Sequence, residues 1–250
     1  MKKNLKNLFS SLESLFFTVP QELSQWNVDY FKGNKKRYED IIRIVNRDFT
    51  GKSILEVGSL PCHLTFLLRE MDYSVVGIDL EPARLERFIS NASLDIKKCE
   101  IETESFPFKD NTFDCVLFTE VFEHLRNPLH VLEEIYRVLR RGGLLILSTP
   151  NLYYLPRFLF FLFGKGLSID LYEELGRVRK VGHVGHIREY SKKELENVLT
   201  KTKFRIIKAF FVTYFKTEKV SFVRSIIDAL SVPLPFFRSH IIFLCEKNNL

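Results

Sequence analysis

Apolar and polar residues follow one another along the chain in blocks that predict strands and helices in turn. Short apolar runs bounded by turn residues predict buried strands, and apolar residues three or four positions apart predict helices. The predicted strands are 52–57, 74–79, 96–101, 113–119, 144–148, 204–214 and 240–246, and the predicted helices are 36–47, 64–71, 83–91, 129–139 and 191–202. Alternating strands and helices favour a doubly wound α/β fold with a mainly parallel sheet.

Turn and cap residues predict where two of these helices begin and end. Ser191 followed by Glu194 predicts the start of the helix over 191–202, because this pair forms a capping box. The "RRGG" sequence after 129–139 predicts a helix stop at Gly142.

The pattern divides the chain into four parts. Residues 1–35 are predicted to form an N-terminal helical segment, and residues 36–151 a cofactor-binding core. Residues 152–190 read as an aromatic and basic insertion on the substrate side, and residues 191–250 as a C-terminal helix with closing strands.

The N-terminal segment has its apolar residues at helical spacing, and Glu13 interrupts the apolar run. We therefore expect an amphipathic helix docked on the core, with no signal peptide and no transmembrane segment. Peripheral contact with a membrane stays open as an alternative for such a helix.

Composition bounds the class of protein. The chain has 250 residues, enough for one sizeable α/β domain, and 24 of them are Phe, which predicts a large core or a greasy substrate groove. Its 37 basic and 31 acidic residues give a net charge of +6, which permits an anionic partner without requiring one. The four cysteines have no paired spacing, so we expect buried, reduced thiols and a cytoplasmic protein.

Acidic residues stand at the predicted carboxyl ends of the strands, where ligands bind in doubly wound sheets. They are Glu56, Asp79 and Glu100, followed by Glu120 and Glu123. The first loop has no Lys or Arg, which argues against a phosphate-rich cofactor. The pattern favours a cofactor with hydroxyls, an ammonium group and a neutral adenine, since a carboxylate about 20 residues after the first loop binds ribose in related folds.

Four sequence blocks within 36–151 point to a family. They read "ILEVGSLPCHLTFLL", "VVGIDLEPARL", "CEIETESFPFKDNTFDCVLFTEVFEHL" and "NPLHVLEEIYRVLRRGGLLILSTPN". In order and spacing these blocks resemble the class I S-adenosylmethionine-dependent methyltransferases of the small-molecule and glycan type. The resemblance implies a Rossmann-like sheet of seven strands with the last one antiparallel, and S-adenosylmethionine as the cofactor.

The resemblance also implies cofactor contacts. Glu56 and Gly58 would approach the methionine part, Asp79 the ribose, and Glu100 with the backbone of Ile101 the adenine. The full predicted cofactor set is Glu56, Gly58, Ser59, Asp79, Leu80, Glu100, Ile101 and Thr119.

The first loop departs from the family pattern, which has glycines where this chain has Leu60 and Cys62. Glycine allows a positive φ and a close approach of the backbone to a ligand. Pro61 favours an extended Leu60, so we expect an altered but retained pocket. A degenerate relative that binds without catalysis is the alternative.

The "FTEVFEHL" segment carries the candidate chemistry. His124 is predicted to act as a general base, with His186 as its counterpart on the "GHVGHIREY" segment. Alternatively, Glu120, Glu123, His124 and His186 hold a divalent ion, with His183 nearby, a set that resembles metal-dependent small-RNA 2′-O-methyltransferases and partly the quinone O-methyltransferases.

The insertion indicates the class of acceptor. It begins with the aromatic "NLYYLPRFLFFLFGKG" and continues with the basic "RVRKVGHVGHIREY". We predict O-methylation of a small-molecule, glycan or lipid-linked acceptor. Nucleic acid is the alternative, given the basic composition, although no RNA-recognition module is present.

Overall fold

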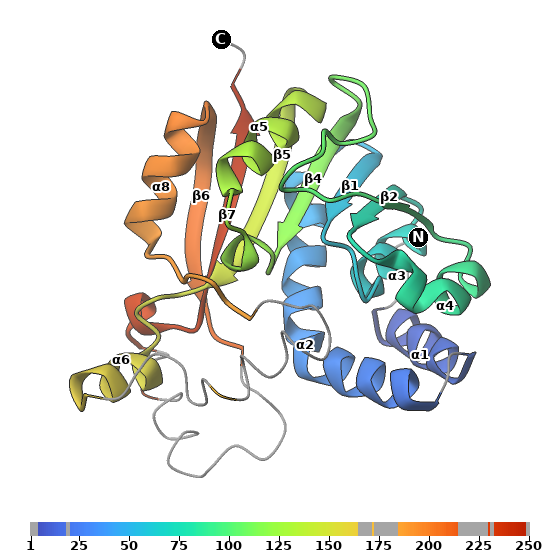
Figure 1. Ribbon diagram of the computed structural model, residues 1–250, viewed down its shortest axis with the longest axis horizontal. Coiled ribbons are helices and arrows are strands. Elements are labelled where there is room, and N and C mark those ends of the chain that lie inside the picture. The colour runs from blue at the N-terminus through green and yellow to red at the C-terminus, as the bar shows by residue number, and fades with distance from the viewer. Residues whose placement is uncertain are drawn as a thin grey trace.

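The computed structural model describes residues 5–18, 21–164, 172, 185–214, 230 and 233–248 (Figure 1). Its centre is a seven-stranded sheet in the order β3-β2-β1-β4-β5-β7-β6. The strands are β1 (Ser53–Val57), β2 (Ser74–Asp79), β3 (Asp95–Lys98), β4 (Phe113–Thr119), β5 (Leu139–Pro150), β6 (Phe204–Val212) and β7 (His240–Lys247).

The sheet is parallel except at β7, which runs antiparallel to both β5 and β6. This arrangement confirms the doubly wound, mainly parallel sheet that the sequence predicted. Strand β1 lies between β2 and β4, so the strand order reverses at β1 and β4. In such sheets this switch point is where the ligand crevice forms.

Alternate residues of the central strands face the two sides of the sheet. Ile54 and Leu117 belong to the apolar cluster under one set of helices, whereas Leu55 and Phe118 belong to the cluster under the other set. Both faces are covered, which explains why the strands are apolar throughout rather than alternating.

Helices cover the two faces separately (Figure 1). The first face carries α1 (Leu5–Leu15), α2 (Gln21–Asp48), α3 (His63–Arg69) and α4 (Glu86–Asn91), and the second carries α5 (Pro128–Val138) and α8 (Lys192–Lys201). The described residues also contain four short 3-10 helices, which are η1 (Phe16–Thr18), η2 (Pro82–Leu85), η3 (Phe122–His124) and η4 (Pro235–Phe237).

The N-terminal helix is docked on the core, as its apolar spacing predicted. Leu8, Phe9 and Leu12 of α1 are buried in the same cluster as Phe31 of α2. Helix α2 is longer than the predicted helix 36–47, and the predicted domain boundary after residue 35 falls inside it.

Two predictions from turn residues had different outcomes. The capping box was right, because the Ser191 hydroxyl accepts from the Glu194 backbone N–H and the Glu194 carboxylate accepts from the Ser191 N–H. The helix stop at Gly142 was wrong. Helix α5 ends at Val138, and Gly142 lies within the long strand β5 with a φ of 70°.

The insertion after β5 is described only in part. Its described helix is α6 (Leu155–Leu162), and His183 lies outside the described residues. All four cysteines are free and buried, as expected. None of the helices in the described residues combines the length and apolarity needed to cross a membrane.

Candidate active site at the ends of strands 1 and 4

A small cavity opens at the carboxyl ends of β1 and β4, the switch point of the sheet. Its volume is about 40 Å³, little more than the share of one water molecule. Glu56, Gly58 and Ser59 line it from β1 and the first loop, and Thr119 and Glu120 line it from the end of β4. The lining is completed by Tyr30, Arg37 and Tyr38 of α2, Leu60 and Pro61 of the first loop, and His63 and Leu64 of α3.

Gly58 is required by the geometry of the first loop. Its φ is 72°, and a Cβ at this position would lie 2.3 Å from Cγ2 of Val121. A side chain is therefore excluded both by the backbone conformation and by the neighbouring residue. The N–H groups of Gly58 and Ser59 both donate to the Ile78 carbonyl, at 2.9 and 3.1 Å, which fixes the loop against β2.

The rest of the loop turns without further glycines. The Leu60–Pro61 peptide bond is cis, and Cys62 adopts the left-handed conformation with a φ of 65°. The position that most needs glycine-like freedom is therefore Cys62 rather than Leu60. Left-handed conformations cost a non-glycine residue roughly 1 kcal/mol, a cost that the buried packing of Cys62 and of α3 offsets.

Asp79 ends β2 and supports this loop. Its Oδ2 accepts from the Leu60 N–H at 2.9 Å, and its backbone carbonyl accepts from the Cys99 N–H at 2.9 Å. Leu80 follows it with an exposed side chain, whereas Glu100 and Ile101 are half-buried beyond the end of β3. The residues predicted to hold the adenosine part therefore lie at the ends of the neighbouring strands β2 and β3, and none of them lines the cavity.

Glu56 is buried at the base of the cavity, and Thr65 of α3 donates its hydroxyl to Glu56 Oε2. Burial is the main cause that raises the pKa of Glu56, to about 8, although the Thr65 hydrogen bonds oppose the rise. The carboxyl group is consequently protonated at neutral pH in the absence of a cation.

This pKa predicts how the stability of the protein varies with pH. A carboxyl that keeps its proton in the fold, and loses it near pH 4.5 when unfolded, stabilises fully below that value. The stabilisation is lost as the pH rises through about 8. Between pH 6.5 and 7.5, the unfolding free energy of the wild type falls as the pH rises, and Glu56 contributes about 1.4 kcal/mol per pH unit to this fall. The Glu56→Gln variant is expected to lack that contribution.

Urea unfolding of both proteins at the two pH values measures this difference. Glutamine keeps an acceptor for Thr65, so it is a conservative control for the hydrogen bond. His63 and His186 have lowered pKa values, so both titrate below the pH range of this measurement. If the unfolding free energies of the wild type and the variant changed equally with pH, Glu56 would be ionised in the folded protein.

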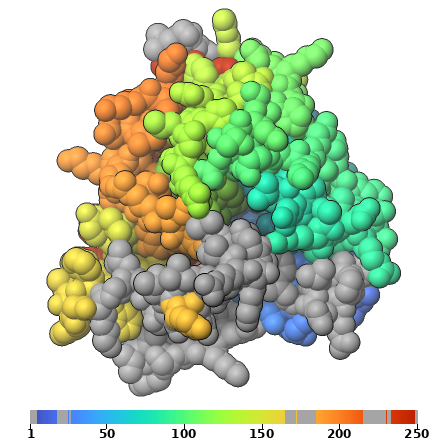
Figure 2. Space-filling view, viewed as in Figure 1, coloured from blue at the N-terminus to red at the C-terminus, as the bar shows by residue number. Residues whose placement is uncertain are grey.

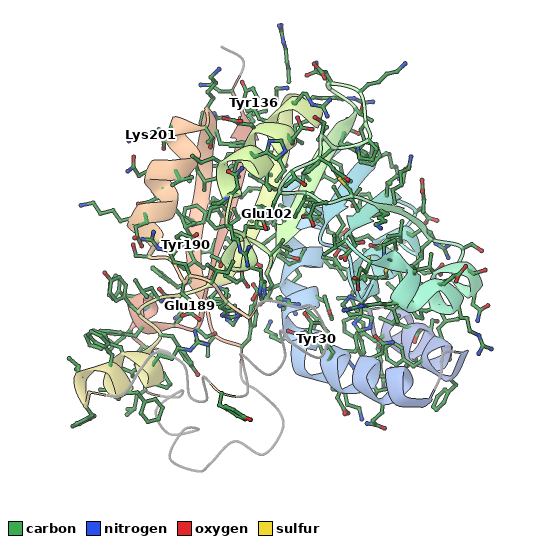
Figure 3. The ribbon with its side chains drawn as sticks, viewed as in Figure 1. Tyr30, Glu102, Tyr136, Glu189, Tyr190 and Lys201 are labelled. Carbon is green, nitrogen blue, oxygen red and sulfur yellow. The ribbon has the colours of Figure 1, made fainter. Side chains whose placement is uncertain are left out.

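Arg37 is a cavity residue that the sequence reasoning missed. It lies on the buried face of α2, only 7% exposed, with Nη1 3.4 Å from Glu120 Oε2 and Nη2 3.3 Å from the Tyr30 hydroxyl (Figure 3 labels Tyr30). The signal was present, since Arg37 interrupts the apolar stripe that continues through Ile41 and Val45. A charged residue on a buried helical stripe usually has a partner or a function.

Glu120 is the anionic centre of this part of the site. Its Oε1 accepts from the Ser148 hydroxyl at 2.7 Å, and its Oε2 lies 3.2 Å from Nε2 of His240, the first residue of β7. Burial alone would raise the pKa of Glu120, but His240, Arg37 and these hydrogen bonds lower it to about 2. Glu120 is therefore ionised at neutral pH, whereas Glu56 is not.

His63, the first residue of α3, is buried beside the cavity. Its Nδ1 lies 3.2 Å from the Tyr38 hydroxyl, and the rings of Phe16 and Phe31 pack around it. Burial, followed by the charge of Arg37, lowers the pKa of His63 to about 3. The ring is thus a neutral part of the wall.

The two predicted histidines come together beyond η3. The ring centroids of His124 and His186 are 4.9 Å apart in an edge-to-face arrangement. Nε2 of each ring lies near Glu123 Oε1, at 3.9 Å for His124 and 4.0 Å for His186. The backbone holds them there, because the N–H groups of Ile187 and Arg188 both donate to the Glu123 carbonyl.

Glu123 is buried and carries one unsatisfied oxygen. Its Oε2 accepts from the Thr149 hydroxyl at 2.9 Å, but Oε1 has no hydrogen-bond partner among the described residues. Burial and the nearby charge of Glu120 raise the pKa of Glu123 to about 8. Its side chain is 1% exposed and is oriented toward the two histidines.

His186 is oriented by a carboxylate on its other nitrogen. Nδ1 lies 3.0 Å from Glu189 Oε1, and Arg157 of α6 forms an ion pair with the same oxygen. A carboxylate only accepts, so Nδ1 carries the proton and Nε2 is the basic nitrogen. Burial, followed by the charges of His124 and Arg157, lowers the pKa of His186 to about 4.

The predicted site residues thus fall into two groups at the same end of the sheet. Thr119 and Glu120 line the cavity with Glu56, Gly58 and Ser59, whereas Glu123, His124 and His186 form a separate cluster. The carboxylate of Glu120 instead contacts Arg37, Ser148 and His240, so Glu120 is not part of the cluster. Figure 3 shows Glu189 and Tyr30 on the two sides of this end of the molecule.

The sequence is similar to known methyltransferases. Residues 55–147 match the family model described as a methyltransferase domain. A protein of Mycolicibacterium smegmatis named as an S-adenosylmethionine-dependent methyltransferase is 27% identical over 117 residues, 46% of this chain and 45% of that protein. The ubiquinone biosynthesis O-methyltransferase of Pseudomonas paraeruginosa is 32% identical over 108 residues, 40% of this chain and 45% of that enzyme. The match therefore spans about half the length of these relatives.

The fold is similar over a longer stretch. An S-adenosylmethionine-dependent methyltransferase from Thermotoga maritima superposes with a TM-score of 0.59 and covers 95% of this chain and 100% of its own. The identity in that superposition is 17%, so the likeness concerns the fold.

Proposed function

We propose that this chain, which belongs to the class I S-adenosylmethionine-dependent methyltransferases, transfers a methyl group from that cofactor to a hydroxyl oxygen of its acceptor. When bound, the cofactor supplies an electrophilic methyl group on a sulfonium sulfur. The observation that carries the proposal is the cavity at the switch point, with Gly58 in a left-handed conformation on one side and Glu120 on the other.

The residues present fit this cofactor. Asp79 and Glu100 stand at successive strand ends, where they would accept hydrogen bonds from the ribose hydroxyls and the adenine amino group. The backbone of Ile101 would meet the adenine ring, beside Leu80. Gly58 lines the cavity with backbone atoms alone, and Ser59 and Thr119 complete the wall.

Arg37 and Glu120 offer the two charges that the methionine part requires. Arg37 would bind the carboxylate, and Glu120 or ionised Glu56 would bind the ammonium group. In the structure Arg37 and Glu120 are paired with each other at 3.4 Å. We expect this pair to separate when the methionine part binds.

His124 is the proposed general base, and His186 its neighbour. A methyl transfer to a hydroxyl releases a proton, and histidine is the side chain that most often accepts such a proton in enzymes. The side chain of His124 is 28% exposed at the rim, which leaves it accessible to an acceptor. Glu123 would stabilise a protonated His124 once its own carboxyl group has lost its proton, since its unsatisfied Oε1 lies 3.9 Å from His124 Nε2.

A divalent ion is the alternative use of the same cluster. The ligand atoms of Glu123, His124 and His186 lie within 4.8 Å of one another, and Glu189 behind His186 resembles the carboxylate that often orients a metal-bound histidine. We favour the general base, because the hydrogen bonds from Ile187 and Arg188 to the Glu123 carbonyl account for the position of the His186 segment without an ion.

Elemental analysis of protein purified without chelator separates the two uses. We expect far less than one equivalent of metal per chain and the same turnover with and without EDTA. One bound equivalent, lost in Glu123→Gln together with activity, would contradict the general-base assignment and support the metal.

The acceptor is proposed to be a small molecule, a glycan or a lipid-linked compound. The relative from Pseudomonas paraeruginosa is named for O-methylation in ubiquinone biosynthesis, and helix α6 of the insertion is strongly apolar. Release of S-adenosylhomocysteine with amphiphilic phenols and lipid-linked glycans, but not with RNA, is the expected outcome. RNA retention with a steep dependence on salt would favour the nucleic-acid alternative.

A further inference from the structure

Large apolar side chains are exposed at the C-terminal end of α6. Four consecutive residues, Phe160, Phe161, Leu162 and Phe163, are between 37% and 78% exposed. Leu234 and Phe236 beside η4 are 51% and 48% exposed. We call these six side chains the apolar tip. Figure 2 shows α6 in yellow at the margin of the molecule.

The apolar tip is built on an ordered base. Tyr153 stacks on Phe236 with centroids 4.7 Å apart, and Phe158 packs against Phe237 at 5.7 Å. The buried Asn151 donates to the carbonyls of Phe236 and Arg238, both at 2.8 Å. The described contacts therefore hold α6 and η4 together, so the exposed side chains are presented by structured backbone.

The arrangement of the apolar residues favours a lipid bilayer as the partner over a groove in another protein. Consecutive helical residues are about 100° apart, so four of them surround the end of the helix. A helix that binds in a protein groove presents one stripe of residues three or four positions apart. An end that is apolar on all sides is suited to insertion between lipid acyl chains, where every direction is apolar.

Charge at this end agrees with an anionic surface. The 13 residues from 153 to 165 contain Arg157 and Lys165 and no acidic residue. Arg157 is paired with Glu189, so these residues together with Glu189 have a net charge of +1. The whole chain carries a net charge of +6. Cations beside an apolar insertion add attraction to anionic headgroups. Helix α6 has eight residues, so it can lie at the interface but cannot span a bilayer.

We propose that the apolar tip docks the protein on the surface of anionic lipid bilayers. The docked surface is connected to the candidate site, because Arg157 of α6 is paired with Glu189, which holds His186. Docking at this place would present the histidine cluster to molecules anchored in the bilayer. Only this last consequence, delivery of a lipid-linked acceptor, rests on the proposed function.

Co-sedimentation with vesicles tests the docking. The probes are phosphatidylcholine vesicles with and without phosphatidylglycerol, added to the full chain without cofactor or acceptor. The variants are Phe163→Glu, a charge-matched control Leu129→Glu on the exposed face of α5, and the uncharged double variant Phe161→Ser/Phe163→Ser. Thermal unfolding of each protein reports that the fold is intact.

We expect the wild type and Leu129→Glu to sediment with the anionic vesicles, less so at high salt. Phe163→Glu and the double serine variant should bind at least tenfold more weakly. Failure of the wild type to sediment would overturn the proposal, and so would equal losses in Phe163→Glu and Leu129→Glu. Self-association without vesicles that the double serine variant abolishes would assign the tip to a second copy of the chain instead. None of these results depends on turnover.

Discussion

Replacing Asp79 with alanine is expected to weaken the binding of S-adenosylmethionine about 100-fold. We propose that the carboxylate of Asp79 accepts hydrogen bonds from the ribose hydroxyls, and bonds to a charged group contribute about 1.5 to 3 kcal/mol each. The same carboxylate accepts from the Leu60 N–H, which holds the first loop. Calorimetric titration of wild type and variant measures the loss.

The Asp79→Asn variant separates these two contributions. Its amide oxygen can still accept from the Leu60 N–H, but it carries no charge and has fewer acceptor sites for the ribose. We expect about a tenfold loss of affinity and a thermal stability close to that of the wild type. Equal affinity in the wild type and in both variants would show that the ribose is held elsewhere.

Replacing His124 with alanine is expected to lower turnover about 100-fold or more while leaving the affinity for S-adenosylmethionine nearly unchanged. A lost general base usually costs a factor of this size. His124 is not one of the proposed cofactor contacts, so its removal is expected to leave them in place. Steady-state turnover with the acceptor, together with a cofactor titration, measures both quantities.

His186→Ala is the companion variant. A similar loss of turnover would place His186 in the acceptor site, whereas near-normal turnover would limit it to supporting the segment through Glu189. The pH dependence of turnover provides a further readout. Turnover of the wild type should fall at low pH as the base becomes protonated, and this fall should be absent in His124→Ala. Full turnover in His124→Ala, with binding abolished in Asp79→Ala, would show that the enzyme acts by proximity alone.

Much of the fold could be predicted because the apolar pattern and the caps act locally. The predicted strands 74–79 and 113–119 agree with β2 and β4 residue for residue. Strand β5 is longer than the predicted 144–148, since it continues through "RRGG" at its exposed start. Gly142 has a positive φ within this strand, whereas its sequence context predicted the end of a helix.

The site could be predicted only where the strands themselves carry it. Glu56, Asp79 and Thr119 follow from the strand ends, and the structure places them on neighbouring strands. Arg37 and His240 could not be found this way, because α2 and the antiparallel β7 bring them in from opposite ends of the chain. Pairing of His240 with Pro150 is what places it beside Glu120.

Titration of the full chain with S-adenosylmethionine tests the central claim most directly, since the first loop lacks two of the glycines typical of the family. The account predicts saturable one-to-one binding, accompanied by a thermal shift, that Asp79→Ala weakens and His124→Ala preserves. No heat and no thermal shift at millimolar cofactor would contradict it, and the cavity between β1 and β4 would then belong to a protein that has kept the fold without the cofactor.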